Sequence, residues 1–215
     1  MSWNLRQNTA KWTSPNWSIK IELMQLPEQS WLQIHDTARK VVLGLGITPN
    51  ELDPQHASAD VRFGEAYVRN RDLTAIYPEH TPRRFGHQID VRMLDEPNPQ
   101  AIALEIWLSI QTSLLDSHPQ LELRWDDVQF NASSENYWTS TSSQIGLMVH
   151  PLDQPDCHTE RTSNGLSMRV FGRFMEKGVI RRMRFRLIAA LDSEPENFWR
   201  ERFAEFSESP LPLTT

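Results

Sequence analysis

Seven of the 22 positively charged side chains in this sequence lie in one short stretch, between Arg169 and Arg186. The chain as a whole has a formal net charge of −6, so this stretch opposes the average. Arginine predominates in it, and the planar guanidinium group pairs through two parallel hydrogen bonds with carboxylate or phosphate groups. The chemistry that these residues could perform is therefore recognition of an anion.

Six of these seven residues occupy two predicted strands, residues 166–175 and 179–190, which flank the seventh, Lys177, and Gly178. Glycine adopts the positive φ of tight turns at little cost, so we expect the two strands to form a hairpin. A slip of one residue would turn every side chain to the other face. The apolar pattern therefore selects the register in which Val170 faces Phe185, with the arginines gathered on the opposite face.

We predict a binding site on the arginine-bearing face of this hairpin. Like charges on adjacent strands repel one another, so something must compensate them. One interpretation is that acidic side chains of a neighbouring strand do so, such as Glu105 or Asp90. The other is an anionic small molecule or the acidic surface of a partner protein, with aromatic rings adding stacking area. The residues predicted to bind such a ligand are Arg169, Arg173, Arg182, Arg184, Arg186, Phe171, Trp107 and Glu105.

The function favoured by these patterns is a non-catalytic binding or interaction module. The sequence contains no GxGxxG, P-loop, HExxH or GxSxG motif, so we identify no catalytic residues and predict no cofactor. The negative net charge argues against nucleic acid as a partner. The alternative is a carbohydrate-active enzyme, in which His80 or His150 and a carboxylate on a concave sheet perform acid–base chemistry. The eight tryptophans suggest stacking on sugars, although packing in a core is the more usual role of this residue.

Potential metal ligands are concentrated in residues 150–160, which include His150, Asp153, Asp156 and Cys157. Their spacing matches no standard zinc pattern, and the chain has no second cysteine. We predict no metal site there.

The elements that must position these residues are mainly strands. Ile102, Leu104, Ile106, Leu108 and Ile110 alternate with polar or mixed side chains, as in a strand with one buried face. We expect an α+β fold dominated by antiparallel sheet, arranged as a two-layer sandwich or half-barrel. We also place Tyr67 on the apolar side of its strand.

One domain is predicted over residues 1–215. It comprises an N-terminal segment (1–58) with a helix at 28–43, an antiparallel β core (59–192), a C-terminal helix (193–208) capped by Ser193, and a tail (209–215). LTAIYP at 73–78 resembles GLMVHP at 146–151, which suggests a duplicated three-strand unit. Chance similarity between strands is the other explanation.

No apolar stretch of the chain reaches the length of a membrane span, and its N-terminus lacks the apolar region of a secretory signal. We therefore expect a cytoplasmic protein that makes no contact with membranes. The sequence does not predict an oligomeric state.

Overall fold

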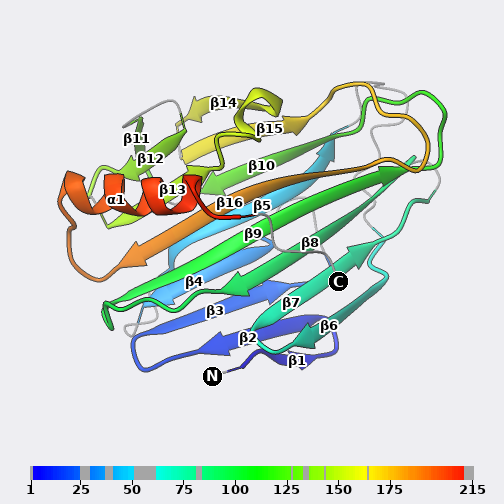
Figure 1. The fold of residues 1–215 in the computed structure, drawn as a ribbon. Coiled ribbons are helices and arrows are strands. Elements are labelled where there is room, and N and C mark those ends of the chain that lie inside the picture. The colour runs from blue at the N-terminus through cyan, green and yellow to red at the C-terminus, as the bar shows by residue number, and fades with distance from the viewer. Residues whose placement is uncertain are drawn as a thin grey trace.

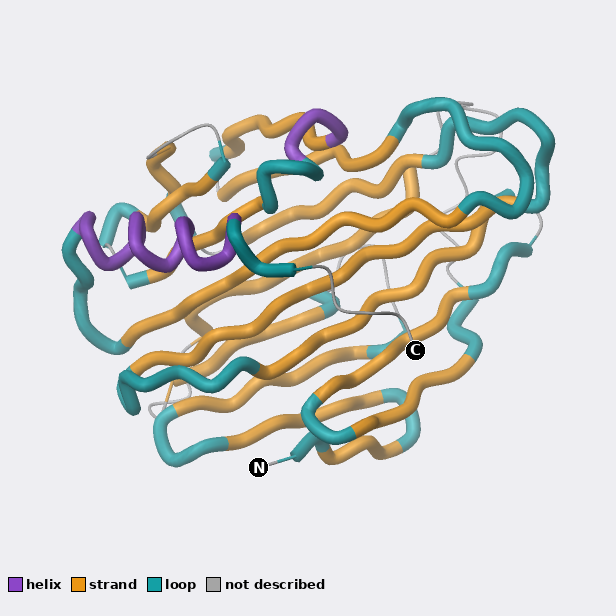
Figure 2. The backbone as a smooth tube through the Cα atoms, viewed as in Figure 1, coloured by secondary structure: helices purple, strands orange, loops and turns teal. Residues whose placement is uncertain are grey.

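Two antiparallel sheets pack face to face in a sandwich (Figures 1 and 2). The structure is a computed structural model that describes residues 2–24, 30–36, 41–50, 62–80, 84–126, 128–132, 136–142, 144–163 and 165–210. In spatial order, sheet A contains β1 (Asn4–Arg6), β2 (Thr9–Thr13), β3 (Trp17–Glu22), β4 (Leu32–Asp36), β5 (Val41–Asn50), β10 (Gln120–Asp126), β15 (Gly165–Phe171) and β14 (Cys157–Thr162). Sheet B contains β11 (Phe130–Ala132), β12 (Tyr137–Ser140), β13 (Ile145–Val149), β16 (Ile180–Ala190), β9 (Ala101–Thr112), β8 (Phe85–Met93), β7 (Asp72–Tyr77) and β6 (Glu65–Arg69).

The core lies between the two sheets, because the alternating strands point their apolar side chains into this space. Ile106 and Leu108 of β9 are buried in the core, as the pattern of that strand predicts. One hydrogen-bonded chain joins the layers: the Trp31 indole donates to the Tyr77 hydroxyl at 2.8 Å, and this hydroxyl donates to the Leu23 carbonyl at 2.9 Å. These polar groups satisfy one another inside an apolar interior, where an unpaired group would be costly.

The predicted N-terminal helix at 28–43 is wrong. Its described residues include β4 and the beginning of β5, and residues 28–29 and 37–40 lie outside the described part of the chain. Leu32 and Ile34 are buried with a spacing of two, a pattern that suits the edge-to-edge pairing of β4 with β3 and β5. Sheet pairing thus overrides a helical spacing that the same apolar residues also permit.

The predicted hairpin of residues 166–175 and 179–190 is also wrong. Strand β15 pairs with β10 and β14 in sheet A, whereas β16 pairs with β9 and β13 in sheet B. The segment that contains Lys177 and Gly178 therefore crosses from one sheet to the other. Gly178 does have the expected positive φ of 80°, but the turn does not bring the two strands together.

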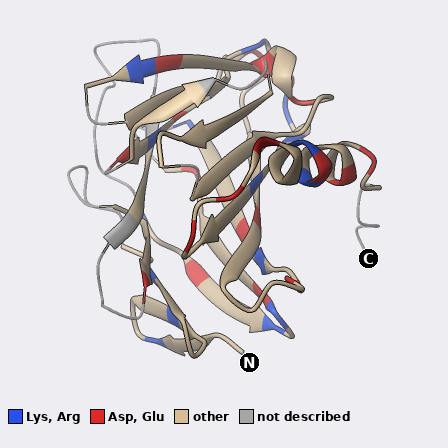
Figure 3. Ribbon diagram, turned by 90° about the vertical axis from the view of Figure 1, so that its left-hand side faces the viewer, with Lys and Arg blue, Asp and Glu red and all other residues tan. Residues whose placement is uncertain are grey.

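The predicted C-terminal helix is confirmed as α1 (Glu196–Ser207), although Pro195 and not Ser193 occupies the N-cap. The helix lies outside the sandwich, against the outer face of sheet B (Figures 1 and 3). Trp199 and Phe206 are buried there with Ile188 of β16 and Ala103 of β9. Gly146 of β13 makes room for the helix, because a Cβ at that position would overlap the Trp199 ring.

The duplicated three-strand unit is not reproduced in the topology. After β7 the chain forms β8 and β9 in the same sheet, whereas after β13 it passes through η2 (Gln154–Asp156) to β14 and β15 in the other sheet. In the described part of the chain, no helix is long and apolar enough to cross a membrane.

Candidate ligand-binding site

Polar side chains from the centre of sheet B line its outer face in rows. The pairing of β16, β9 and β8 aligns Arg182 with Ser109 and Gln88, Arg184 with Trp107 and Asp90, and Arg186 with Glu105 and Arg92. Side chains at alternate positions of a strand share a face, so the three arginines project from the same side of β16. They lie in very different surroundings.

Arg186 is paired beneath helix α1. Its Nη2 and Nε lie 2.6 and 3.2 Å from Glu105 Oε1, and both residues are buried. The guanidinium also stacks on the ring of Phe206, 4.7 Å from its centroid. For Arg186, an acidic neighbour therefore compensates the positive charge, as the first interpretation expects, and these two side chains already satisfy each other.

Arg184 is held in a second buried network. Asp153 Oδ2 accepts hydrogen bonds from the backbone N–H and the Nε of Arg184, at 3.0 and 3.2 Å. The Arg184 Nη2 lies 2.7 Å from Nδ1 of His150, and Nδ1 must be the acceptor because a guanidinium only donates. Burial, and next the charge of Arg184, lower the pKa of His150, against an opposing effect of Asp153. Both this hydrogen bond and the lowered pKa favour the neutral form of His150 in the folded protein.

Arg182 is fixed in place without a carboxylate. Its Nε donates to Ser109 Oγ at 3.1 Å, and its guanidinium carbon lies 5.4 Å from the centroid of the Trp107 ring. Among the described residues, none forms a hydrogen bond or an ion pair with its two terminal nitrogens. Arg182 therefore presents a pre-oriented pair of N–H donors to a ligand, in the geometry that suits a carboxylate or a sulfate.

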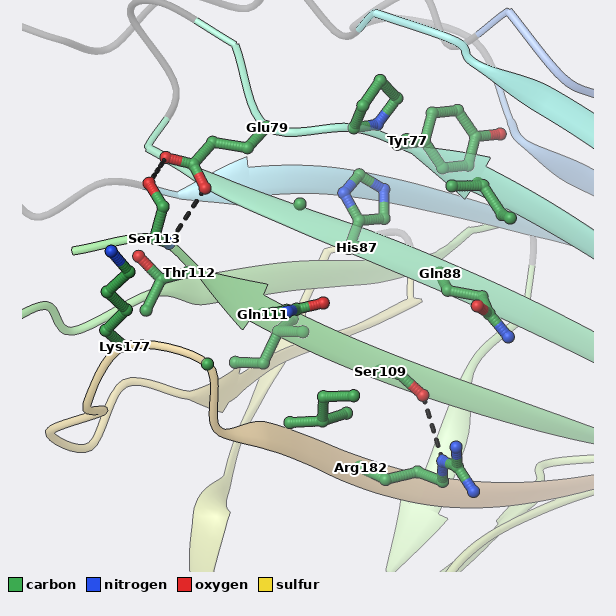
Figure 4. A pocket seen from close by; sticks show the side chains of 16 residues that line it. Tyr77, Glu79, His87, Gln88, Ser109, Gln111, Thr112, Ser113, Lys177 and Arg182 are labelled. Carbon is green, nitrogen blue, oxygen red and sulfur yellow. Dashed lines mark hydrogen bonds between the residues drawn. The ribbon is translucent and has the colours of Figure 1, made fainter. Parts of the chain in front are cut away.

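A pocket of about 450 Å³ lies beside Arg182 on this face (Figure 4). Figure 4 shows Arg182, Ser109 and Gln88 at one end of the pocket, Lys177, Glu79 and Ser113 at the other, and Gln111 between them. The described residues that line it are Ile76, Tyr77, Pro78, Glu79, Gly86, His87, Gln88, Ser109, Ile110, Gln111, Thr112, Ser113, Lys177, Gly178, Ile180 and Arg182. Amides, hydroxyls and charges therefore alternate with apolar surface.

Local backbone features shape the end of the pocket opposite Arg182. The Glu79 carboxylate accepts from the Ser113 hydroxyl at 2.5 Å and from the Ser113 backbone N–H at 3.0 Å. Gly178 donates its N–H to the Thr112 carbonyl at 3.1 Å, which ties the crossing segment to the end of β9. Gly86 allows the chain at Glu79 to approach closely, since a Cβ there would lie 3.1 Å from the Glu79 nitrogen.

The structure does not bring the other predicted site residues to this pocket. Arg169 is exposed on β15 of sheet A, and Arg173 forms an ion pair with Asp156 and donates to the Pro155 carbonyl at 2.9 Å. Phe171 is buried at the end of β15. Their grouping with Arg182, Arg184 and Arg186 depended on the hairpin that does not form.

Trp107 is not the exposed stacking surface that the sequence suggests. Only 7% of it is exposed, and Arg182 lies over its ring. All eight tryptophans of the sequence are buried. Trp107 instead supports the guanidinium of Arg182.

Gln88, Ser109, Gln111 and Lys177 line the pocket but are absent from the predicted site. The polar positions of Gln88, Ser109 and Gln111 in otherwise alternating strands mark the outer face correctly, whereas Lys177 lies in the turn before β16. The missing information is strand order, because the pairing of β8 with β9 and of β9 with β16 brings the three strand residues beside Arg182.

Three of the potential metal ligands in residues 150–160 contact arginines: His150, Asp153 and Asp156. His150 and Asp153 contact Arg184, and Asp156 forms ion pairs with Arg173 and Arg181. No cluster of three or more His, Cys, Asp or Glu side chains suited to a metal occurs among the described residues.

The two histidines proposed for acid–base chemistry, His80 and His150, are not among the described residues that line the pocket. A third histidine, His87, does line it and stacks on Tyr77, with ring centroids 4.5 Å apart. His150 is bound to Arg184, and His80 follows Glu79 without lining the pocket.

No family model and no curated protein matches this chain in sequence. In structure, it is similar to a heparan sulfate lyase HepC mutant from Pedobacter heparinus, with a TM-score of 0.56 and 9% identity over 91% of this chain and 38% of the lyase. It is also similar to a putative kojibiose phosphorylase from the human microbiome, with a TM-score of 0.47 and 9% identity over 95% of this chain and 32% of that one. The chain thus spans about a third of the length of these proteins, and the first likeness shows a shared sandwich fold.

Proposed function

We propose that this protein is a non-catalytic binding module for an acidic saccharide, held in the pocket between β8, β9 and β16. The observation that carries the proposal is that the Arg182 guanidinium is held in place without a carboxylate partner among the described residues. Ser109 and Trp107 fix its guanidinium, and no described carboxylate neutralises it. A carboxylate or sulfate of the ligand would occupy its terminal nitrogens as a two-pronged partner.

The rest of the pocket suits a sugar. A sugar ring presents hydroxyls at its edge and C–H groups on its faces, so it needs both polar and apolar contacts. Gln88 and Gln111 supply amides, and Ile76 and Ile180 supply apolar surface. A concave site with a few orienting polar groups is also better suited to a small ligand than to the surface of a protein.

Binding without catalysis is favoured by the carboxylates available. Most glycoside hydrolases place two carboxylates on either side of the bond that they cleave. Among the described residues that line the pocket, Glu79 is the only acid, and it is already bonded to Ser113. The similar lyase is named for heparan sulfate, which is a reason to test sulfated saccharides, but the proposal rests on Arg182.

Calorimetric titration with matched saccharides tests the proposal. The probes are a tetrasaccharide that contains glucuronate and the same tetrasaccharide with its carboxyl groups reduced to alcohols, each at low and at moderate salt. We expect the acidic form to bind more tightly, with an affinity that falls as salt rises, because a partly exposed ion pair is screened. A sulfated tetrasaccharide is titrated beside them.

The Arg182→Gln variant should bind the acidic probe about tenfold more weakly or worse. Arg169→Gln is the matched control, because it removes the same charge from an exposed position on the other sheet. It should bind as the wild type does. Equal affinity of the Arg182→Gln variant and the wild type, or no binding of any acidic probe, would overturn the proposal.

A further inference from the structure

The row of side chains beside Arg182 continues beyond the pocket across the outer face of sheet B. Trp107 of β9, which supports Arg182, pairs with Asp90 of β8. Asp90 pairs with Thr74 of β7, and Thr74 pairs with Tyr67 of β6. In the part of the chain that the structure describes, no helix lies over these outer strands, because α1 covers the other end of the face (Figure 1).

Tyr67 ends this row as an exposed aromatic ring. Its neighbours Ala66 and Val68 pack against the core, so Tyr67 projects from the outer side of β6, contrary to the sequence prediction. It is 46% exposed, and the only other aromatic side chain exposed to this extent in the described residues is Phe174. A flat, exposed ring at the edge of a polar surface is suited to stacking on the face of a sugar.

Asp90 lies between Tyr67 and Arg182 and is held by neutral partners. Its Oδ1 accepts from the Thr74 hydroxyl at 2.6 Å, and Gln88 Nε2 donates to both of its oxygens at 3.0 and 2.9 Å. No described lysine or arginine forms an ion pair with it. Since a carboxylate has about four acceptor positions, Asp90 can accept a further hydrogen bond. An uncharged sugar with free hydroxyls fits here, whereas a second acidic unit would be repelled.

Building on the proposed function, we propose that the ligand is an acidic oligosaccharide that crosses the strands from Arg182 to Tyr67. Its acidic unit binds Arg182, an uncharged unit donates a hydroxyl to Asp90, and a further unit stacks on Tyr67. Four steps between strands separate β16 from β6, a span of about 19 Å at the usual strand spacing. A single sugar cannot cover this distance, so affinity should depend on chain length.

Calorimetric titration with a length series tests this inference. The probes are the methyl glycoside of glucuronic acid and oligosaccharides of two and four units with glucuronate at one end and neutral sugars elsewhere. We expect the tetrasaccharide to bind about tenfold more tightly than the monosaccharide. The Tyr67→Ala variant should lose this gain while keeping the affinity for the monosaccharide, and Tyr67→Phe, which keeps the ring, should retain it.

The outcomes separate this inference from the proposed function. A gain with length that disappears in Tyr67→Ala supports the crossing path. Equal affinity for all lengths, with Arg182 still required, would overturn the crossing path and leave the pocket as the whole site. Loss of affinity for the monosaccharide in Tyr67→Ala would also overturn it, since this residue lies outside the pocket. If no member of the series binds, both proposals fail.

Discussion

The arginine side chains of strand β16 have opposite surroundings toward its two ends. At the end covered by helix α1, Arg184 and Arg186 are buried and each has a carboxylate partner. At the open end, Arg182 has a hydroxyl and an aromatic ring but no described carboxylate. These arginines alternate along one strand and face the same way, so their partners and not their positions in the sequence distinguish them.

The difference separates charges that hold the fold together from a charge that is available to a ligand. A charge that is removed from water must be paired, because burying it alone costs several kcal/mol. Helix α1 can therefore pack over Arg186 only because Glu105 neutralises it. Where no helix covers β16, Arg182 keeps its contact with solvent and needs no internal partner.

The largest expected effect comes from breaking the covered pair. Arg186→Met leaves the Glu105 carboxylate buried without its partner and should lower the free energy of unfolding by about 3–5 kcal/mol. Adding Glu105→Met removes the isolated charge and should recover a large part of this loss. Urea unfolding of the two variants and the wild type measures both effects. If the double variant is as unstable as the single one, the charge is not the cause.

A second variant tests whether the stability of the protein depends on the close packing of helix α1 against β13. Gly146→Ala places a methyl group where the Trp199 ring lies, and overpacking of this kind typically costs about 1–3 kcal/mol. Gly46→Ala is the control, because a Cβ there meets only the Arg124 side chain, at an ordinary distance of 3.6 Å. Thermal and urea unfolding should rank Gly146→Ala well below Gly46→Ala. Equal stability would show that α1 packs loosely.

Acid should weaken the covered end through His150. Its pKa is lowered in the folded protein, so below its ordinary value of 6.5 the unfolded chain binds a proton more readily than the folded one. The stability contributed by neutral His150 is therefore complete above that pH and declines as the pH falls. Urea midpoints at about pH 7.5 and about pH 5.5 measure the decline, which should be smaller in His150→Gln. An equal decline in the variant and the wild type would show that His150 is not its cause.

The smallest effect on stability is expected at the open end. Arg182→Gln removes one hydrogen bond and one contact with an aromatic ring, which together contribute at most about 1 kcal/mol at a partly exposed position. The same variant should nevertheless have the largest effect on saccharide binding. A loss of stability comparable to that of Arg186→Met would contradict this separation of structural and binding charges.

The sequence predicts the buried face of β9 and β16 correctly but not that of β6, and it predicts the partners of the strands poorly. Met183 and Phe185 are buried and Arg182 projects outward, as alternation indicates. The Lys177–Gly178 turn suits a hairpin and yet joins two sheets, because turn chemistry specifies a local conformation and not the strand that follows it. Pairing over long sequence separations depends on the packing of the whole sandwich.

In the candidate site, too, the sequence predicts the faces of strands but not which strands are neighbours. Arg182 can be predicted from its position among the arginines, and Gln88 can be placed on an outer face by alternation. Their common pocket arises only because β9 lies between β8 and β16. Glu105, the partner of Arg186, is among the acids that the sequence suggests. Asp153, the partner of Arg184, is not, because it comes from the turn after β13 rather than from a strand.

The pairing of β9 with β16 has a consequence for how the protein is made. Arg186 and Glu105 are separated by 81 positions in the chain, and the strands that hold them form the centre of sheet B. Contacts between such distant segments slow folding, because a long loop must close before they form. During synthesis, β9 therefore cannot pair with β16 until β16 has been made. The apolar faces of β8 and β9 stay exposed until then. We expect the pocket to be among the latest features to mature, and a nascent chain that ends before β16 to require protection from aggregation.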